Sequence, residues 1–158
     1  MIPATTDAEQ KTRSSQSSSA NRRSTYIYAA MALISLVGLA DATYLTIQHV
    51  TGQSVRCTIV SGCSEVLSSQ YAVVAGKPLA LIGAAAYFTV FALATLGAFG
   101  YRFVGVVLYL LVASMLLVSL WLTYLQAFVI RSFCQYCLLS AAITLTLGTL
   151  LYIRSRNP

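Results

Sequence analysis

Four long apolar segments constrain the fold of this chain more than any other feature of its sequence. They cover residues 26–48, 79–99, 103–128 and 133–153. A helix needs about 20 apolar residues to cross the hydrocarbon core of a bilayer, and it can satisfy its backbone hydrogen bonds internally there. Only 9% of the residues are charged, compared with about a quarter in ordinary globular domains. The sequence therefore predicts an all-α integral membrane protein whose single domain, over residues 26–153, is a bundle of four transmembrane helices.

The segments between these spans differ in length and composition. The connections after the second and third spans are so short that we expect the helices they join to be antiparallel neighbours. Residues 49–78 form a much longer loop, and loops of more than about 15 residues in compact domains usually have a function. Residues 1–25 are polar and rich in serine, which predicts a disordered tail. Residues 154–158 form a second, short tail.

The basic residues predict how the bundle is oriented. Seven of the ten lysines and arginines lie in the N-terminal tail, in the second connection or after the fourth span, and the others are Arg56, Lys77 and Arg131. Because cytoplasmic segments are enriched in lysine and arginine, both termini are predicted to be cytoplasmic, with the loop at 49–78 outside. The net charge of +6 comes from residues that flank the spans rather than from a basic stripe, so nucleic-acid binding is not expected.

All four cysteines fall on this predicted extracytoplasmic face. Cys57 and Cys63 lie in the long loop, and Cys134 and Cys137 form a Cys-x-x-Cys pair at the start of the fourth span. Residues three apart in the first turn of a helix share a face, and the unpaired amides at the helix N-terminus favour a thiolate there. Arg131, one turn earlier, is expected to add to this effect. The pattern predicts a dithiol that exchanges with a second pair, in a compartment where disulfides persist.

Two further features concern the surroundings of the cysteines. Residues 64–74 are expected to form a short amphipathic helix that lies over the bundle, with Ser64 as its N-cap. Gly76-Lys77-Pro78 is expected to end this helix, because proline disfavours helical structure in the residue before it. Asp41 lies inside the first span, where an ionisable group is costly and often functional. Both proton transfer and a hydrogen bond across the bundle are consistent with it.

The cysteine pattern alone leaves two other interpretations open. Four cysteines are a possible zinc site, which would make this a metal-binding membrane protein, although five residues separate Cys57 from Cys63 where two to four are typical. An oxidising compartment also disfavours zinc, and no metal is expected. Alternatively, two structural disulfides could staple the loop of a non-catalytic membrane scaffold. Turnover of a dithiol with an electron acceptor distinguishes an enzyme from both.

Four motifs along the chain belong together. They are Gly38-Leu39-Ala40-Asp41, Cys57-(five residues)-Cys63-Ser64-Glu65-Val66-Leu67-Ser68-Ser69, Gly76-Lys77-Pro78-Leu79-Ala80-Leu81-Ile82-Gly83 and Cys134-Gln135-Tyr136-Cys137. Together they resemble the vitamin K epoxide reductase family in its bacterial form, and the similarity covers about residues 26–153. The resemblance implies a four-helix bundle around a quinone, with Cys134 and Cys137 as the redox centre and Cys57 and Cys63 as a shuttle.

The resemblance also implies where the quinone lies. Ser69 matches the family's loop serine, and the expected quinone-contacting residues are Ser69, Tyr71, Leu79, Ala141 and Asp41. The animal enzymes have an asparagine near Leu79 and a tyrosine near Ala141, and neither is present here. This departure favours quinone reduction coupled to thiol oxidation over epoxide reduction. The expected quinone is ubiquinone or menaquinone, with a vitamin K-type quinone as a further candidate.

The expected function is that of an oxidoreductase of the bacterial plasma membrane. Many bacterial relatives carry a fused thioredoxin-like domain after a fifth span, whereas this chain stops at Pro158. The electron donor is therefore expected to be a separate extracytoplasmic protein, either DsbA-like or thioredoxin-like. Electrons are expected to pass from it to Cys57, Cys63, Cys134 and Cys137 in turn, and then to the quinone, in support of disulfide formation.

Overall fold

The computed structural model describes residues 5–53, 55, 62–74, 76–101 and 103–156 of the chain. Cys57 therefore lies outside the described residues, and so does Arg56. Nearly all of the described chain is helical, as the apolar segments predict. In chain order the elements are α1 (Thr5–Val50), α2 (Cys63–Ser68), the 3₁₀ turn η1 (Gln70–Ala72), β1 (Val73–Val74), β2 (Lys77–Pro78), α3 (Leu79–Ala98), α4 (Val104–Tyr124), the π-helical turn η2 (Leu125–Ile130) and α5 (Gln135–Arg156).

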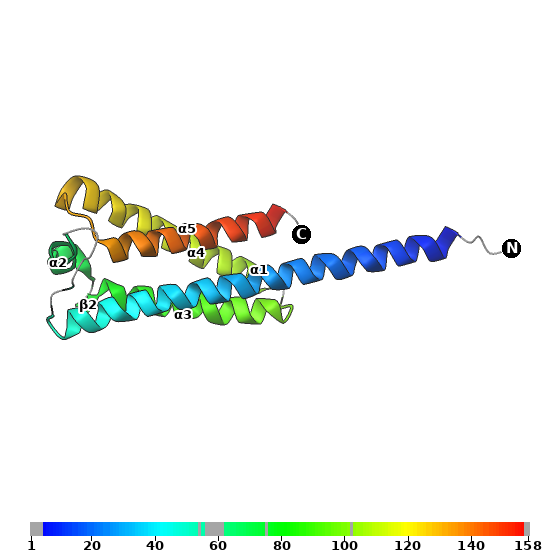
Figure 1. Cartoon of the computed structure of the whole chain (residues 1–158), viewed down its shortest axis with the longest axis horizontal. Coiled ribbons are helices and arrows are strands. Elements are labelled where there is room, and N and C mark those ends of the chain that lie inside the picture. The colour runs from blue at the N-terminus through cyan, green and yellow to red at the C-terminus, as the bar shows by residue number, and fades with distance from the viewer. Residues whose placement is uncertain (1–4, 54, 56–61, 75, 102, 157–158) are drawn as a thin grey trace.

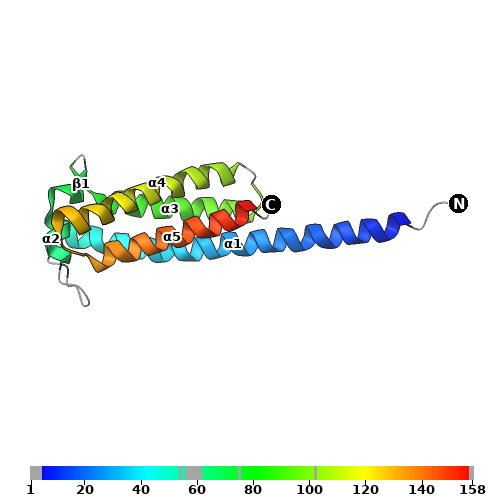
Figure 2. The same cartoon turned by 90° about the horizontal axis from the view of Figure 1, so that it is seen from above.

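Four helices of the described chain are long and apolar enough to cross a membrane, which confirms the predicted fold class. The candidate spans are Ser24–Val50, Leu79–Ala98, Val104–Ile130 and Gln135–Arg156, within a few residues of the segments read from the sequence. Figures 1 and 2 show them as one bundle, with α2 lying across one end. The far end of α5 and the short α3–α4 connection lie at the opposite end. The protein is thus a multi-pass membrane protein whose loop elements cap a helical bundle.

Helix α1 begins earlier than its composition suggests. It includes most of the tail for which the sequence predicts disorder, and this part projects well beyond the bundle (Figure 1). Starting a helix is the costly step, whereas extending an existing one adds a hydrogen bond for each residue fixed. The polar segment continues a helix that the membrane span has already started, and composition alone does not capture this.

Close packing between the spans depends on a small residue opposite a large one. A Cβ atom placed on Gly38 of α1 would lie only 2.5 Å from the ring of Tyr87 of α3. Tyr87 is almost fully buried, and its hydroxyl lies 2.8 Å from Ser140 Oγ and 3.1 Å from Thr144 Oγ1 of α5. Small residues at membrane helix interfaces allow such close approach. Gly38 therefore lets one tyrosine connect three of the four spans.

The end of the bundle away from α2 is held by Arg154 of α5. Its guanidinium group lies 4.3 Å from the ring centre of Tyr28, and its Nε donates a hydrogen bond of 3.4 Å to Ser24 Oγ. Both partners belong to α1, at the start of its span. The first and last spans therefore meet where the chain enters and leaves the bundle.

The loop elements differ from the single helix expected over residues 64–74. Helix α2 is one and a half turns long and begins at Cys63, so Gly62 is the N-cap and Ser64 lies inside the helix. The chain then forms η1 and a two-residue hairpin in which Val73 pairs with Pro78. Ser69 ends α2 early because its backbone is extended, with φ −66° and ψ 152°. The periodic pattern of apolar residues continues past this point, but the helix does not.

Candidate active site

The Cys-x-x-Cys pair lies at the start of α5, under the loop elements. Cys134 is fully buried and directly precedes the helix, and its carbonyl oxygen accepts a 3.0 Å hydrogen bond from the amide of Leu138. It thus occupies the cap position rather than the first turn. Cys137, one turn further into the bundle, is partly buried and lines an internal cavity. Both are free thiols. The pair therefore connects the loop side of the protein to its interior.

The surroundings of Cys134 favour its thiolate. A hydrogen bond from the Cys137 thiol, helped by the backbone amides of Cys137 and Tyr136, lowers the pKa of Cys134 from 9.0 to about 7, although burial opposes the shift. A negative charge on Asp41 also acts to raise this pKa. The exposed Arg131 is not among the causes, so the sequence-based expectation about its role is wrong. The lowered pKa makes the thiolate of Cys134 more available near neutral pH, and the thiolate is the nucleophile in disulfide exchange.

Gln126 is a site residue that the sequence analysis missed. It is almost fully buried, and its Oε1 accepts a 3.0 Å hydrogen bond from the backbone amide of Cys134. It lies in η2, and π-helical turns often occur at functional sites. After η2 the chain turns at Arg131, a non-glycine residue in the left-handed region with φ 54°. A glutamine near the end of an otherwise apolar span was the signal that could have identified it.

The loop contributes Cys63, which is disulfide-bonded and buried in the same apolar cluster as Cys134. The two segments touch next to these cysteines, because a Cβ atom on Gly62 would lie 2.8 Å from the carbonyl oxygen of Phe133. The Ser132 hydroxyl also donates a hydrogen bond to the Glu65 carboxylate of α2. The residues next to Cys63 are therefore packed against the residues next to Cys134. This contact makes exchange between the loop and the Cys-x-x-Cys pair geometrically reasonable.

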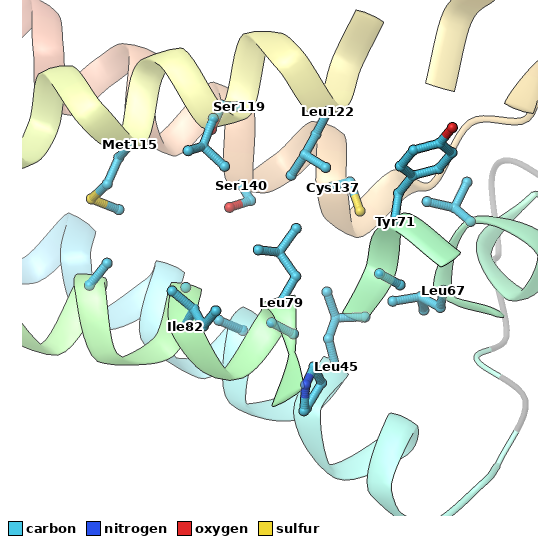
Figure 3. Close-up of a pocket in the computed structure, with 18 of the residues that line it drawn as sticks. Leu45, Leu67, Tyr71, Leu79, Ile82, Met115, Ser119, Leu122, Cys137 and Ser140 are labelled. Carbon is cyan, nitrogen blue, oxygen red and sulfur yellow. The ribbon is translucent and has the colours of Figure 1, made fainter. Parts of the chain in front are cut away.

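A cavity of about 350 Å³ lies beneath the loop elements, between the spans. Figure 3 shows Cys137 between Leu122 of α4 and Tyr71 of η1, with Leu79 and Ile82 of α3 forming another part of the wall. Ligand sites for small molecules have volumes of about 300–1,000 Å³ and mostly apolar walls with a few polar groups. The polar and titratable residues on its wall are Asp41, His49, Ser69, Tyr71, Tyr87, Ser114, Ser119, Gln126, Cys137, Ser140 and Thr144.

The cavity contains most of the residues that were expected to contact a quinone. Asp41, Ser69, Tyr71 and Leu79 line it, but Ala141 does not. The lining face of α5 is formed by Cys137, Ser140 and Thr144, and the position four residues after Cys137 is rotated about 40° beyond Cys137, away from this stripe. The expectation for Ala141 is therefore not supported by the geometry.

Ser69 and Asp41, which both line the cavity, differ in whether their side chains are hydrogen-bonded. Ser69 donates a 2.7 Å hydrogen bond from Oγ to the carbonyl oxygen of Val66, which stabilises the end of α2. Asp41 is buried with 9% of its surface exposed, and its Oδ2 has no hydrogen-bond partner among the described residues. The hydrogen bond across the bundle that the sequence allowed for Asp41 is therefore not present at this oxygen.

As for metal binding, the described residues contain no group of three or more His, Cys, Asp or Glu side chains able to hold an ion.

Comparison with known proteins adds two findings. Residues 29–152 match the vitamin K epoxide reductase family. The thiol-disulfide oxidoreductase LTO1 of Arabidopsis thaliana is 37% identical over 119 residues, which is 69% of this chain but only 31% of that protein. The chain therefore spans about a third of the length of this relative. The segment that matches the family includes all four cysteines and the cavity.

Proposed function

The chain belongs to the vitamin K epoxide reductase family, and from this membership we propose that it is a thiol:quinone oxidoreductase. The family and the similarity to a thiol-disulfide oxidoreductase support a membrane thiol oxidoreductase. One observation supports the finer proposal above all others. The free dithiol of Cys134 and Cys137 lies between a disulfide-bonded loop cysteine and an apolar cavity among the spans.

The residues of the cavity fit a quinone. Its apolar walls suit a flat, lipid-soluble ring, and Leu79, Ile82, Met115 and Leu122 would hold that ring beside Cys137. When bound, a quinone supplies an acceptor for two electrons and two protons. Because Leu79 gives the wall an apolar side chain where the animal enzymes have asparagine, we propose quinone reduction rather than epoxide reduction. Ubiquinone and menaquinone are the candidates.

Electrons are proposed to reach the dithiol by successive disulfide exchange. A reduced partner attacks Cys57 of the loop disulfide and is released as its own disulfide, which leaves Cys57 and Cys63 reduced. The Cys63 thiolate then attacks Cys134 of an oxidised Cys134–Cys137 pair and releases the Cys137 thiolate, and Cys57 resolves the mixed disulfide. The described cysteines, with Cys63 oxidised and the inner pair reduced, match the stage after this exchange.

The partner and the orientation follow from where the cysteines lie. We propose that the α2 end of the bundle faces the extracytoplasmic side of a bacterial plasma membrane and that both termini are cytoplasmic, in accord with the distribution of basic residues. The partner would be a DsbA-like or thioredoxin-like protein. In this setting the protein would reoxidise its partner and so support disulfide bond formation.

Steady-state turnover tests this proposal. Purified protein in detergent is mixed with a reducing dithiol and a soluble ubiquinone or menaquinone analogue, and hydroquinone formation is measured. Wild-type protein should turn over, while Cys134→Ser and Cys137→Ser should not. Cys63→Ser should lose activity with a protein donor but retain some with a small dithiol that can reach Cys134. A wild-type protein that reduces neither analogue would contradict the quinone proposal and favour the scaffold or metal-binding interpretation.

A further inference from the structure

The carboxyl group of Asp41 is a polar side chain on the wall of the cavity without an evident structural role. It is about nine-tenths buried, and its Oδ2 has no hydrogen-bond partner among the described residues. An ionised carboxylate in such surroundings would be costly, because no described residue is seen to pair with its charge. A protonated carboxyl group would avoid this cost. Asp41 is therefore well placed to hold a proton next to the dithiol.

We propose that Asp41 is the proton donor that accompanies electron transfer from the Cys134–Cys137 dithiol to a quinone. This inference rests on the proposed function, and it adds a residue to the reaction. Asp41 and Cys137 line the same cavity from α1 and α5. If Asp41 were ionised, it would be near enough to Cys134 to raise the pKa of that thiol. The carboxyl group therefore lies where protons are needed.

The proton balance of the reaction requires a donor in addition to the Cys137 thiol. Near neutral pH, Cys134 reacts as a thiolate, because its pKa is about 7, whereas Cys137 reacts as a thiol. Formation of the Cys134–Cys137 disulfide releases two electrons and one proton, and Asp41 adds the second proton, so that the quinone leaves as a hydroquinone. The negative charge that was on the Cys134 thiolate before the reaction is then on the Asp41 carboxylate, so the total charge is unchanged. Asp41 then recovers its proton from water.

The other titratable groups around the cavity are less suited to this role. Tyr71 of η1 is 39% exposed, and the Tyr87 hydroxyl of α3 is already hydrogen-bonded to α5. His49 lies two turns after Asp41 on the same face of α1, at a distance of about 12 Å along the helix. Helix α4 contributes no titratable group to the described lining. Of these groups, His49 lies nearest the end of its span, next to Val50.

Two substitutions of Asp41 test the proposal, with one control. Asp41→Asn keeps the shape but removes the acidic proton, Asp41→Glu restores it, and Thr46→Val is a control on α1 outside the cavity. Pre-reduced protein is mixed with a ubiquinone analogue, and the rate of hydroquinone formation is followed against pH. Asp41→Asn should slow this step by about 10²–10⁴-fold, the usual contribution of a general acid. The deficit should grow as pH rises, because protons from water become scarcer, and Asp41→Glu should recover part of the rate.

Two readouts without quinone separate this role from a structural one. The infrared spectrum of the reduced protein should contain the C=O band of a protonated carboxyl group that Asp41→Asn removes. The pH midpoint for alkylation of Cys134 should be the same in wild type and Asp41→Asn, because a neutral Asp41 exerts no charge on the thiol. A lower midpoint in Asp41→Asn would mean that Asp41 is ionised at rest and would overturn the proposal.

The outcome also distinguishes this inference from the proposed function. If wild-type protein reduces the quinone and Asp41→Asn does so equally fast at every pH, Asp41 is not the donor but the oxidoreductase remains. If wild-type protein does not reduce the quinone at all, the proposed function itself is wrong, and the donor role is lost with it.

Discussion

At the scale of single residues, the chemistry depends on how Cys134 is held. Its thiol receives a hydrogen bond from Cys137, and its amide donates one to Gln126. The hydrogen bond from Cys137 favours the ionised form of the sulfur, and the one to Gln126 holds the backbone of Cys134. A buried thiol without them would be less reactive, because burial in apolar surroundings raises the pKa of a cysteine.

The reactivity of Cys134 should depend on pH in a defined way. Alkylation of the reduced protein should be half-maximal near pH 7, because the pKa of Cys134 is lowered to about 7 and the thiolate is the reacting form. Replacement of Cys137 by alanine removes the main cause of this shift, so the midpoint should move upward. Mass spectrometry after brief exposure to iodoacetamide measures this. An unchanged midpoint in Cys137→Ala would show that the hydrogen bond is not the cause.

Gln126→Leu should weaken both stability and exchange. The substitution introduces an apolar side chain of similar size and leaves the buried amide of Cys134 without its acceptor, at a cost of about 1–3 kcal/mol in the free energy of unfolding. Thermal unfolding in detergent measures this loss, and Gln53→Leu, at an exposed position, is the control. A variant as stable as wild type would contradict the importance of the hydrogen bond.

Site residues differed in how readily the sequence predicted them. The spacing of Cys134 and Cys137 is a local signal, and an aspartate within an apolar span is conspicuous. Leu79 and Ser69 came from a family resemblance, and the cavity includes both. Ala141 was misplaced because a helical face cannot be oriented without its neighbours. Gln126 acts through a contact eight residues away across a π-turn, and no periodic pattern encodes that contact.

At the scale of elements, α2 lies in close contact with the segment before α5, and Cys63 shares a buried cluster with Cys134. The four spans could be predicted because about 20 apolar residues have few alternatives in a bilayer. The loop could not be predicted in detail, because α2, η1 and the small hairpin are too short to be set by their own sequence. Their shape depends on packing against Phe133 and the bundle end.

Gly62→Ala tests this contact. The added methyl group would lie 2.8 Å from the Phe133 carbonyl oxygen, so α2 must shift away from Cys134. Overpacking of this kind costs about 1–3 kcal/mol. Exchange between Cys63 and Cys134, followed by rapid acid quench and mass mapping, should slow at least several-fold, whereas Gly105→Ala, which meets only the end of the Arg154 side chain, should not affect it. Equal rates in the two variants would show that α2 is not held at this point.

At the scale of the whole molecule, the site of thiol exchange and the site of quinone binding are proposed to lie at different depths along the bundle. In the proposed relay, disulfide exchange takes place at the α2 end of the bundle (Figure 1), and the cavity lies among the spans beside Cys137 (Figure 3). The far end, where Arg154 contacts Tyr28, anchors the first and last spans to each other. This arrangement requires the α2 end to face the compartment of the thiol partner.

Topology reporters test that requirement. A cytoplasmic reporter fused to the C-terminus should be active and an extracytoplasmic reporter fused there should be inactive. The reason is that the basic residues favour the cytoplasmic side for both ends of the chain. A fusion within the α3–α4 connection should give the same result. Activity of an extracytoplasmic reporter at the C-terminus would place the cysteines on the reducing side and contradict the proposed role.

The relay between the two cysteine pairs is tested most directly by leaving only one cysteine of each. The double variant Cys57→Ser/Cys137→Ser retains Cys63 and Cys134, while Cys57→Ser/Cys134→Ser retains Cys63 and Cys137 as a matched control. After mild oxidation of the purified proteins, mass mapping measures the yield of the internal disulfide over time. Because Cys63 and Cys134 are both buried members of one cluster, whereas Cys137 packs against its edge and lines the cavity, the first variant should form its disulfide rapidly and the second slowly. Slow formation in the first variant, or equal rates in both, would show that electrons do not pass from Cys63 to Cys134.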